Sequence, residues 1–411
     1  MYSHAICIMG LLTLLCSSSA LAIEPTEQSN AVSETERSLL EKALKADMAP
    51  EHQGADSSST TRIVQPVGGS STNPDIALIL DFAAAYFSEE DGLQTGAHDP
   101  AQTGFTFQQL ELHAESRIDP YFELQANLVF SALGVEVEEA YAQTLAMPWS
   151  LQTRFGQILI PFGRANPTHP HTWRFLNQSL MVGKFLGGEG GRGLGAEASW
   201  LTPLPWYTKL IVMISQPSGE CCSKSFSGGP LAPTTGWNDF LYSTRLEQFW
   251  EASSAWSILL GGSYLIGENK SGIGNLSALT GGDVLIRYRP TNSAHRRSLN
   301  IQIEWTHRSR QRPGAVWTDH GGYIETVVDW SRMWSSGVRW EWLTGVEDDD
   351  LDPEWIGRRM RTSAQITWRP SHFSRLRLQL GHDDPEWLDT PIWSTMLGLE
   401  VLAGAHGAHG Y

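Results

Sequence analysis

From residue 75 towards the C-terminus, apolar and polar residues alternate with a period of two. This pattern constrains the fold more than any other feature of the chain. In one segment Leu299, Ile301, Ile303 and Trp305 alternate with Asn300, Gln302, Glu304 and Thr306. Segments 122–131, 360–368 and 375–380 repeat the pattern. A period of two places apolar side chains on one face of a strand and polar side chains on the other. A soluble β-sandwich also alternates, so the connections must discriminate between the two folds.

The connections between the alternating segments are short and long in turn. We predict sixteen strands, near residues 75–88, 104–117, 121–132, 135–146, 150–160, 194–201, 206–215, 239–249, 255–265, 279–289, 297–308, 321–330, 335–345, 358–369, 374–382 and 393–405. Seven connections are tight, and most of the others are long, including 161–193 and 216–238. Tight turns at one end and long loops at the other are typical of outer-membrane barrels.

Aromatic residues mark the end with the tight turns. Beside the seven turns lie Tyr121, Trp149, Trp206, Trp250 with Trp256, Tyr288, Trp330 with Trp334, and Trp368. Amphipathic rings of this kind form a girdle at a membrane interface. The prediction is an all-β fold, a single closed antiparallel transmembrane β-barrel of about sixteen strands at 75–411, with an aqueous lumen.

The segment before the barrel divides into three parts. An apolar run followed by Ala20 and Ala22 predicts a cleaved signal peptide at 1–22, and hence export. Within 23–74, capping-box spacing and helical periodicity predict a short periplasmic helix at 32–48. This helix either docks elsewhere in the periplasm or associates with a second copy of itself. Residues 51–74 resemble a flexible linker.

Charge and motifs exclude several classes of function. The net charge of −16 argues against nucleic-acid binding. Residues 188–193 match GxGxxG, but no βαβ pattern surrounds them, so we interpret them as a tightly turning loop. No nucleophile elbow, HExxH helix or Walker sequence occurs. We therefore expect no enzymatic activity.

The long loop 161–193 is the candidate functional element, because it is far longer than a hairpin needs. In a wide barrel such a loop can fold inward and narrow the pore. Its basic side chains face only one acidic residue, Glu189, and are the pore-constriction candidates Arg164, His169, His171, Arg174, Lys184 and Arg192. A positive constriction favours anions.

His169 and His171 are also candidate metal ligands, because imidazole pairs bind Zn²⁺ or Cu²⁺. Two ligands are fewer than a structural site needs, so histidines that bond to the barrel wall are the alternative. Cys221 and Cys222 form a disulfide, pair between chains or bind a soft metal. The acidic run at 347–354 is interpreted as a solvated loop.

Several motifs carry a family resemblance. Segments 135–141, 162–164, 169–171 and 185–190 read VEVEEAY, FGR, HPH and FLGGEG. They resemble the bacterial outer-membrane family labelled zinc-regulated TonB-dependent outer membrane receptor. More distantly they resemble the sixteen-stranded phosphate-selective porins. The motifs cover roughly residues 135–201. The family label implies metal uptake driven by TonB.

The sequence therefore predicts a porin-like channel in the bacterial outer membrane for passive diffusion of small hydrophilic solutes or ions, and the basic loop favours anions. The alternatives are a metal-linked receptor, in which zinc would be the cofactor, and a non-conducting adhesion barrel. Expected partners are outer-membrane lipid, small solutes and, through Tyr411, the barrel-assembly machinery.

Overall fold

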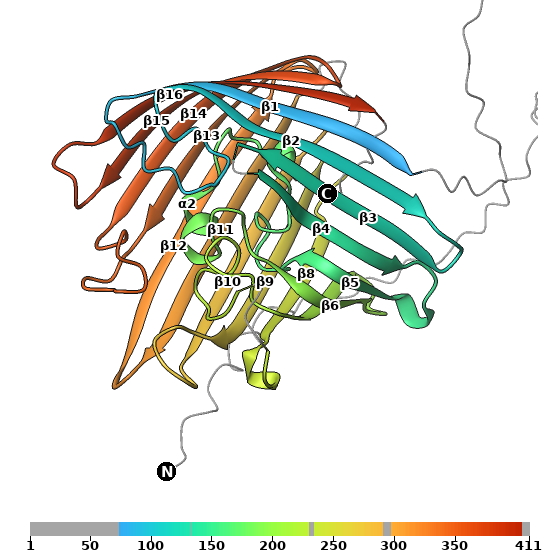
Figure 1. Ribbon diagram of the computed structural model, residues 1–411. Coiled ribbons are helices and arrows are strands. Elements are labelled where there is room, and N and C mark those ends of the chain that lie inside the picture. The colour runs from blue at the N-terminus through green and yellow to red at the C-terminus, as the bar shows by residue number, and fades with distance from the viewer. Residues whose placement is uncertain (1–73, 133, 230–233, 291–296, 405–411) are drawn as a thin grey trace, which may run out of the picture. The chain divides into compact units, whose positions relative to one another are not determined.

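The computed structural model describes residues 74–132, 134–229, 234–290 and 297–404. The predicted signal peptide, the helix at 32–48 and Tyr411 lie outside these residues. The described residues form sixteen antiparallel strands, each paired with its neighbours in sequence, and β1 also pairs with β16 to close the barrel (Figure 1). The predicted closed sixteen-stranded barrel is confirmed.

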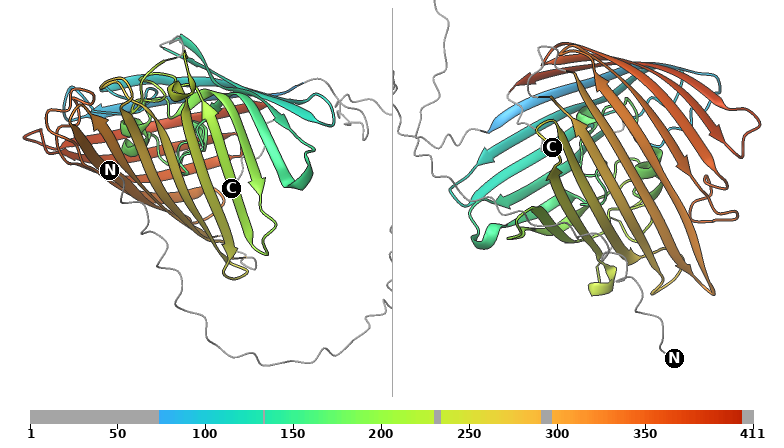
Figure 2. Two further views of the ribbon diagram at one scale, coloured as in Figure 1. Left: turned by 90° about the horizontal axis from the view of Figure 1, so that it is seen from below. Right: turned by 180° about the vertical axis from the view of Figure 1, so that it is seen from behind.

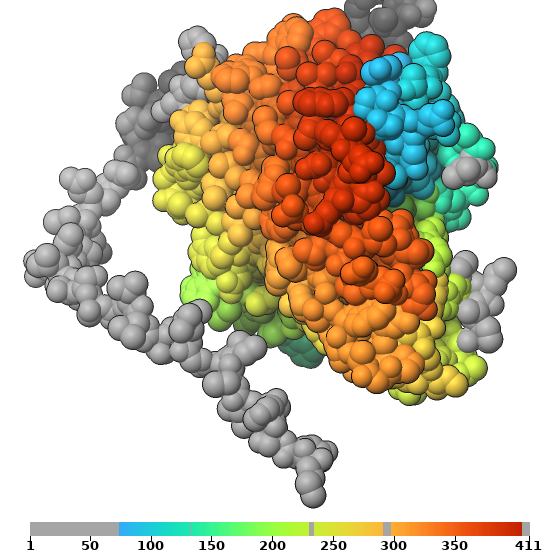
Figure 3. All heavy atoms as spheres, turned by 90° about the vertical axis from the view of Figure 1, so that its left-hand side faces the viewer, coloured from blue at the N-terminus to red at the C-terminus, as the bar shows by residue number. Residues whose placement is uncertain are grey.

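The strands follow the alternating segments closely. They are β1 (Asp75–Phe87), β2 (Gly104–Arg117), β3 (Phe122–Ser131), β4 (Gly134–Thr144), β5 (Leu151–Leu159), β6 (Arg192–Leu201), β7 (Tyr207–Ser215), β8 (Leu241–Glu251), β9 (Trp256–Glu268), β10 (Leu276–Tyr288), β11 (Ser298–Arg312), β12 (Ala315–Asp329), β13 (Trp334–Leu343), β14 (Arg359–Ser371), β15 (Ser374–Pro385) and β16 (Ile392–Gly404). Short helical segments are η1 (Pro148–Ser150), η2 (Pro170–Thr172), α2 (Leu180–Phe185) and η3 (Trp237–Asp239). Figure 3 shows the C-terminal strands, in red, beside the blue β1.

Side chains alternate across the barrel wall as the period of two predicts. On β15, Leu378 is 45% exposed on the outer face, whereas Gln379 is 1% exposed on the inner face. The aromatic rings beside the tight turns pack in pairs across neighbouring strands, as Trp256 does with Tyr288 and Trp334 with Trp368. Among the described residues, no helix is long and apolar enough to cross a membrane.

One connection differs from the prediction. The predicted strands 297–308 and 321–330 leave a long connection at 309–320. In the structure, the chain between β11 and β12 is instead a tight turn at Pro313 and Gly314. Gly314 has a φ of 78°, a conformation that glycine adopts at little cost, and both strands extend to meet at this turn.

The register makes a testable prediction on β11. Ile303 points outward at mid-strand, and its neighbour Gln302 lines the lumen. We expect Ile303→Arg to lower the free energy of unfolding by about 2–4 kcal/mol, because a guanidinium at the lipid face loses its hydration. Gln302→Arg is the matched control, since its side chain stays in water. Equal losses in the two variants, measured by urea unfolding in lipid vesicles, would contradict the register.

Candidate functional site

The inward loop (residues 160–191) connects β5 to β6 and lies inside the barrel (Figures 1 and 2). Its backbone is bonded to three separate parts of the wall. The amide of Gly163 donates to Ser263 Oγ on β9 at 3.0 Å, and that of Leu176 donates to Gln379 Oε1 on β15 at 2.9 Å. The amide of Leu180 donates to Glu341 Oε1 on β13 at 2.8 Å. These bonds to β9, β13 and β15 fix the loop inside the lumen.

The segment Phe162-Gly163-Arg164 directs the loop into the lumen. Phe162 is 1% exposed and belongs to the apolar cluster inside the barrel. Gly163 has a φ of 65°, and a Cβ there would lie 1.7 Å from Glu304 Oε1, so only glycine fits. The carboxylate of Glu304 accepts hydrogen bonds from the amides of Arg164 and Ala165, at 3.1 and 3.0 Å. The backbone is thus fixed where the Arg164 side chain leaves it.

Helix α2 fills part of the lumen with apolar side chains. Ser179 caps its first turn by accepting a hydrogen bond from the amide of Val182. Buried apolar side chains of the helix pack with inward-facing residues of the wall and of loop 216–240, among them Leu180, Met181, Phe185, Phe226, Leu265, Leu279 and Leu343. This packing closes the part of the lumen that α2 occupies.

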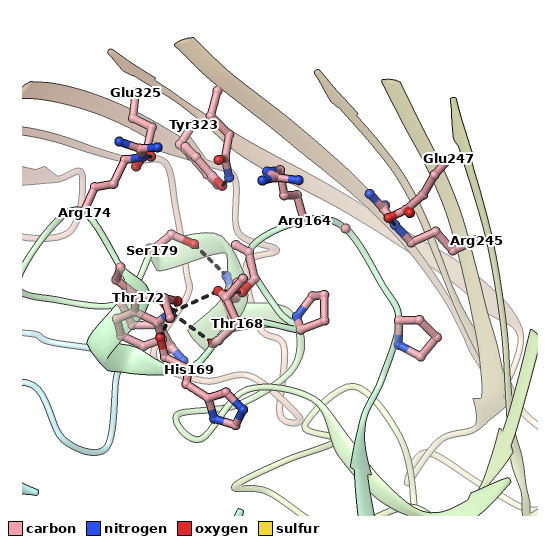
Figure 4. A pocket seen from close by; sticks show the side chains of 18 of the residues that line it. Arg164, Thr168, His169, Thr172, Arg174, Ser179, Arg245, Glu247, Tyr323 and Glu325 are labelled. Carbon is pink, nitrogen blue, oxygen red and sulfur yellow. Dashed lines mark hydrogen bonds and ion pairs between the residues drawn. The ribbon is translucent and has the colours of Figure 1, made fainter. Parts of the chain in front are cut away.

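A cavity of about 750 Å³ lies between the inward loop and the wall (Figure 4). Seven basic side chains line it: Arg154, Arg164, Arg174, Lys209, Arg245, Arg287 and Arg339. Three acidic side chains line it: Glu197, Glu247 and Glu325. With histidine neutral, the lining carries four more positive than negative charges.

The surplus charge is concentrated on a few side chains. Arg154 is paired with Glu197 through two hydrogen bonds, and Arg245 with Asp283 likewise. In contrast, the guanidinium of Arg164 and the ammonium of Lys209 form no ion pair or side-chain hydrogen bond with any described residue. Arg174 approaches Glu325 only at 3.9 Å. Burial lowers the pKa of Arg164, but arginine stays charged at neutral pH. These charges are available to a solute.

The structure separates the six predicted constriction residues into two groups. Arg164, His169 and Arg174 line the cavity. The other three lie outside the lining, and each contacts a carboxylate: His171 contacts Glu111, Lys184 contacts Asp319, and Arg192 contacts Glu136. Lys184 is fully buried, and burial lowers its pKa to about 8 despite the opposing charge of Asp319.

The two candidate metal-ligating histidines lie together against the wall. Their rings stack with centroids 5.7 Å apart. His169 Nδ1 lies 2.7 Å from Glu138 Oε2 on β4, and His171 Nδ1 lies 2.7 Å from Glu111 Oε2 on β2. Although burial lowers the pKa of His169, the charge of Glu138 raises it well above its usual range. The surroundings therefore favour a cation at this place.

The carboxylates that contact these histidines, Glu111, Glu138 and Glu139, were not predicted from the sequence. The sequence did offer a sign of them, because 138–139 belongs to the VEVEEAY segment and Glu111 lies in a predicted strand. The acidic run at 347–354 was predicted to be a solvated loop. Asp349 and Asp352 are instead buried, and they pair with Arg310 and Arg308. Cys221 and Cys222 form a disulfide with each other.

Comparison with known proteins supports the fold. No protein-family model matches the chain. A protein of Aquifex aeolicus (strain VF5), described as uncharacterized, is 27% identical over 402 residues, covering 84% of this chain and 81% of that protein. Among solved structures, OprB of Pseudomonas putida superposes with a TM-score of 0.54 at 10% identity, covering 81% of this chain and 94% of that chain.

Two further solved structures are outer-membrane barrels. An anion-selective porin from Comamonas acidovorans superposes with a TM-score of 0.51 at 10% identity, covering 80% of this chain and 99% of that chain. OmpT of Vibrio cholerae superposes with a TM-score of 0.51 at 9% identity, covering 80% of this chain and 97% of that chain. The fold is that of bacterial outer-membrane barrels. At these identities the likeness concerns the fold alone.

Proposed function

We propose that this protein is a porin-like channel of the bacterial outer membrane that passes small hydrophilic solutes by diffusion and prefers anions. The observation that carries the proposal is the cavity beside the inward loop, which is lined by Arg164 and Lys209, two charges with no ion-pair partner among the described residues. Positive charge held in a narrow passage lowers the barrier for anions and raises it for cations.

The barrel architecture supports diffusion rather than energised transport. Sixteen to eighteen strands are typical of porins with an aqueous channel, whereas plugged outer-membrane transporters have 22. The closed barrel here has sixteen strands. One solved barrel of this fold is named an anion-selective porin, which describes that protein and is compatible with the proposal. The resemblance to zinc-regulated TonB-dependent receptors supports a metal-linked role as the second candidate. The observation that favours it is the His169 cluster, formed by His169, His171, Glu111, Glu138 and Glu139.

The proposal extends to the predicted segments outside the described residues. We infer export with a signal peptide at 1–22 and insertion by the barrel-assembly machinery through Tyr411. No enzymatic step is part of the proposed function.

Planar bilayers test the channel directly. We expect the purified protein to give discrete conductance steps, and the reversal potential across a KCl gradient to show preference for Cl⁻. The preference should be larger in 0.1 M than in 1 M KCl, because salt shortens the Debye length from about 10 Å to about 3 Å. Inserted, folded barrels without conductance would contradict the channel. Preference for K⁺ would contradict the role of the basic cavity lining.

A further inference from the structure

The His169 cluster in the lumen wall has the composition of a metal site. Glu111 comes from β2, Glu138 and Glu139 from β4, and His169 and His171 from the inward loop. All five side chains are buried, with at most 7% exposure. One ligand atom from each of Glu111, Glu138 and His169 lies within 4.8 Å of the other two. Ligands about 2.0–2.2 Å from a tetrahedral ion lie about 3.3–3.6 Å apart. The site therefore needs a small rearrangement, in which His169 Nδ1 and Glu138 Oε2, now 2.7 Å apart, separate to admit the ion.

The charge of the cluster requires a cation. In the described part of the chain, no arginine or lysine lies within 4.0 Å of these three glutamates; their ion-pair partners are His169 and His171. Within ion-pair distance, the described residues therefore place only two imidazoles beside three buried carboxylates, and Arg154 acts on Glu139 from farther away. Burying carboxylates away from a compensating charge is costly, so protons or a metal ion must supply it.

One carboxylate oxygen of the cluster lacks a partner among the described residues. Oε1 of Glu111 is buried and accepts no hydrogen bond from any described residue. Its Oε2 is held by His171 at 2.7 Å. A buried carboxylate oxygen with no donor is rare in folded proteins, and an ion absent from the coordinates is one of its ordinary explanations.

The surrounding residues orient the ligands. Asn127 accepts a hydrogen bond at Oδ1 from His113 Nδ1, at 2.6 Å, which turns its Nδ2 towards His169 Nε2 at 2.7 Å. Nε2 of His169 is thereby engaged, and Nδ1 faces Glu138. In Figure 4 the His169 side chain points away from Arg164 and Arg174. Supporting hydrogen bonds of this kind are typical around metal-ligating histidines and carboxylates.

A second cluster of the same residue types provides a contrast. His98 lies 3.1 Å from Glu136 and 2.9 Å from Glu189, and Arg192 Nη2 lies 2.6 Å from Glu136. Although burial lowers it, hydrogen bonds to the two glutamates raise the pKa of His98 to about 10. This cluster holds two cations for two carboxylates, so it needs no ion.

We propose that Glu111, Glu138 and His169 bind a divalent transition-metal ion of the Zn²⁺ or Co²⁺ class, with His171 and Asn127 as positioning residues. Mixed imidazole and carboxylate ligands suit such ions. The ion would join the inward loop to β2 and β4, so the site fixes the loop that carries Arg164 and Arg174. The binding claim does not depend on conductance, so it stands or fails separately from the proposed channel.

Metal titration of the folded full-length chain in detergent tests this proposal. The chain carries His406→Ala and His409→Ala, which remove the C-terminal histidines as competing ligands. We expect one equivalent of Co²⁺ to bind with visible absorption bands, Zn²⁺ to displace it, and Zn²⁺ to raise the unfolding temperature. If Co²⁺ showed no saturable binding, the proposal would be overturned, and protons alone would compensate the charge of the cluster.

The Co²⁺ affinities of single-residue variants then identify which side chains bind the ion. We expect Glu111→Gln to weaken Co²⁺ binding at least tenfold, and His171→Ala to weaken it about tenfold through loss of support for Glu111. Glu136→Gln, in the contrasting cluster on β4, is the matched control and should bind normally. Unchanged affinity in Glu111→Gln, or a loss only in Glu136→Gln, would overturn the assignment. Heat-dependent gel mobility checks that each variant is folded, and the parent titration remains decisive if one is not.

Discussion

Replacing Arg164, Arg174 and Lys209 together by glutamate is expected to invert the ion selectivity of the channel. The three substitutions change the charge of the cavity lining from plus four to minus two. They remove only one ion pair, the 3.9 Å approach of Arg174 to Glu325, so the barrel should fold. Since charge in a narrow passage sets the barrier for each ion, the reversal potential in a KCl gradient should change sign.

A second triple variant distinguishes the effect of charge in the cavity from the effect of the protein's net charge. Arg117, Arg332 and Arg358 are exposed outside the cavity, and their replacement by glutamate gives the same change in net charge. This control should retain Cl⁻ preference, because exposed charges beyond a Debye length are screened. If both triple variants shift the reversal potential equally, the surface and not the cavity sets selectivity. If neither triple variant shifts the reversal potential, ions do not pass beside the inward loop.

The barrel could be predicted from the sequence because the residue pattern within each strand indicates which of its faces points to lipid. Period-two alternation fixes which side chains face lipid, and the turn residues fix where strands end. This local information located all sixteen strands. It failed at 309–320, where a polar stretch hid the continuation of β11 and β12 through the turn at Gly314.

The candidate site was less predictable because its charges depend on partners distant in sequence. Counting basic residues in the loop gave equal weight to Arg164 and Lys184. In the structure Arg164 has no ion-pair partner among the described residues, whereas Lys184 meets Asp319 on β12. Similarly, Gln379 faces inward as the alternation requires, but it binds the amide of Leu176 instead of open water. Only the folded loop shows which inward side chains remain available to a solute.

The contact between Lys184 and Asp319 belongs to a buried ion-pair network beside α2. Asp319 accepts two hydrogen bonds from Arg308, at 2.8 and 2.6 Å, and lies 2.7 Å from Lys184. Arg308 also contacts Asp352, which lies 3.1 Å from Lys224. The side chains of Lys184, Arg308 and Asp319 are at most 3% exposed. The network therefore joins α2, the wall and two loops, and the side chains at its centre are buried.

Removing the negative charge of Asp319 should release α2. We expect Asp319→Asn to destabilise the docked loop by about 3–5 kcal/mol, because it leaves Lys184 and Arg308 buried with one fewer carboxylate. Chymotrypsin should then cleave near Phe185, and single-channel conductance should rise as the helix leaves the passage. Lys184→Met is the matched control. It keeps the Arg308–Asp319 pair and removes the buried ammonium together with the cost of its desolvation, so docking should change little. If Lys184→Met opened the channel as much as Asp319→Asn, the lysine itself and not the balance of buried charge would hold the helix.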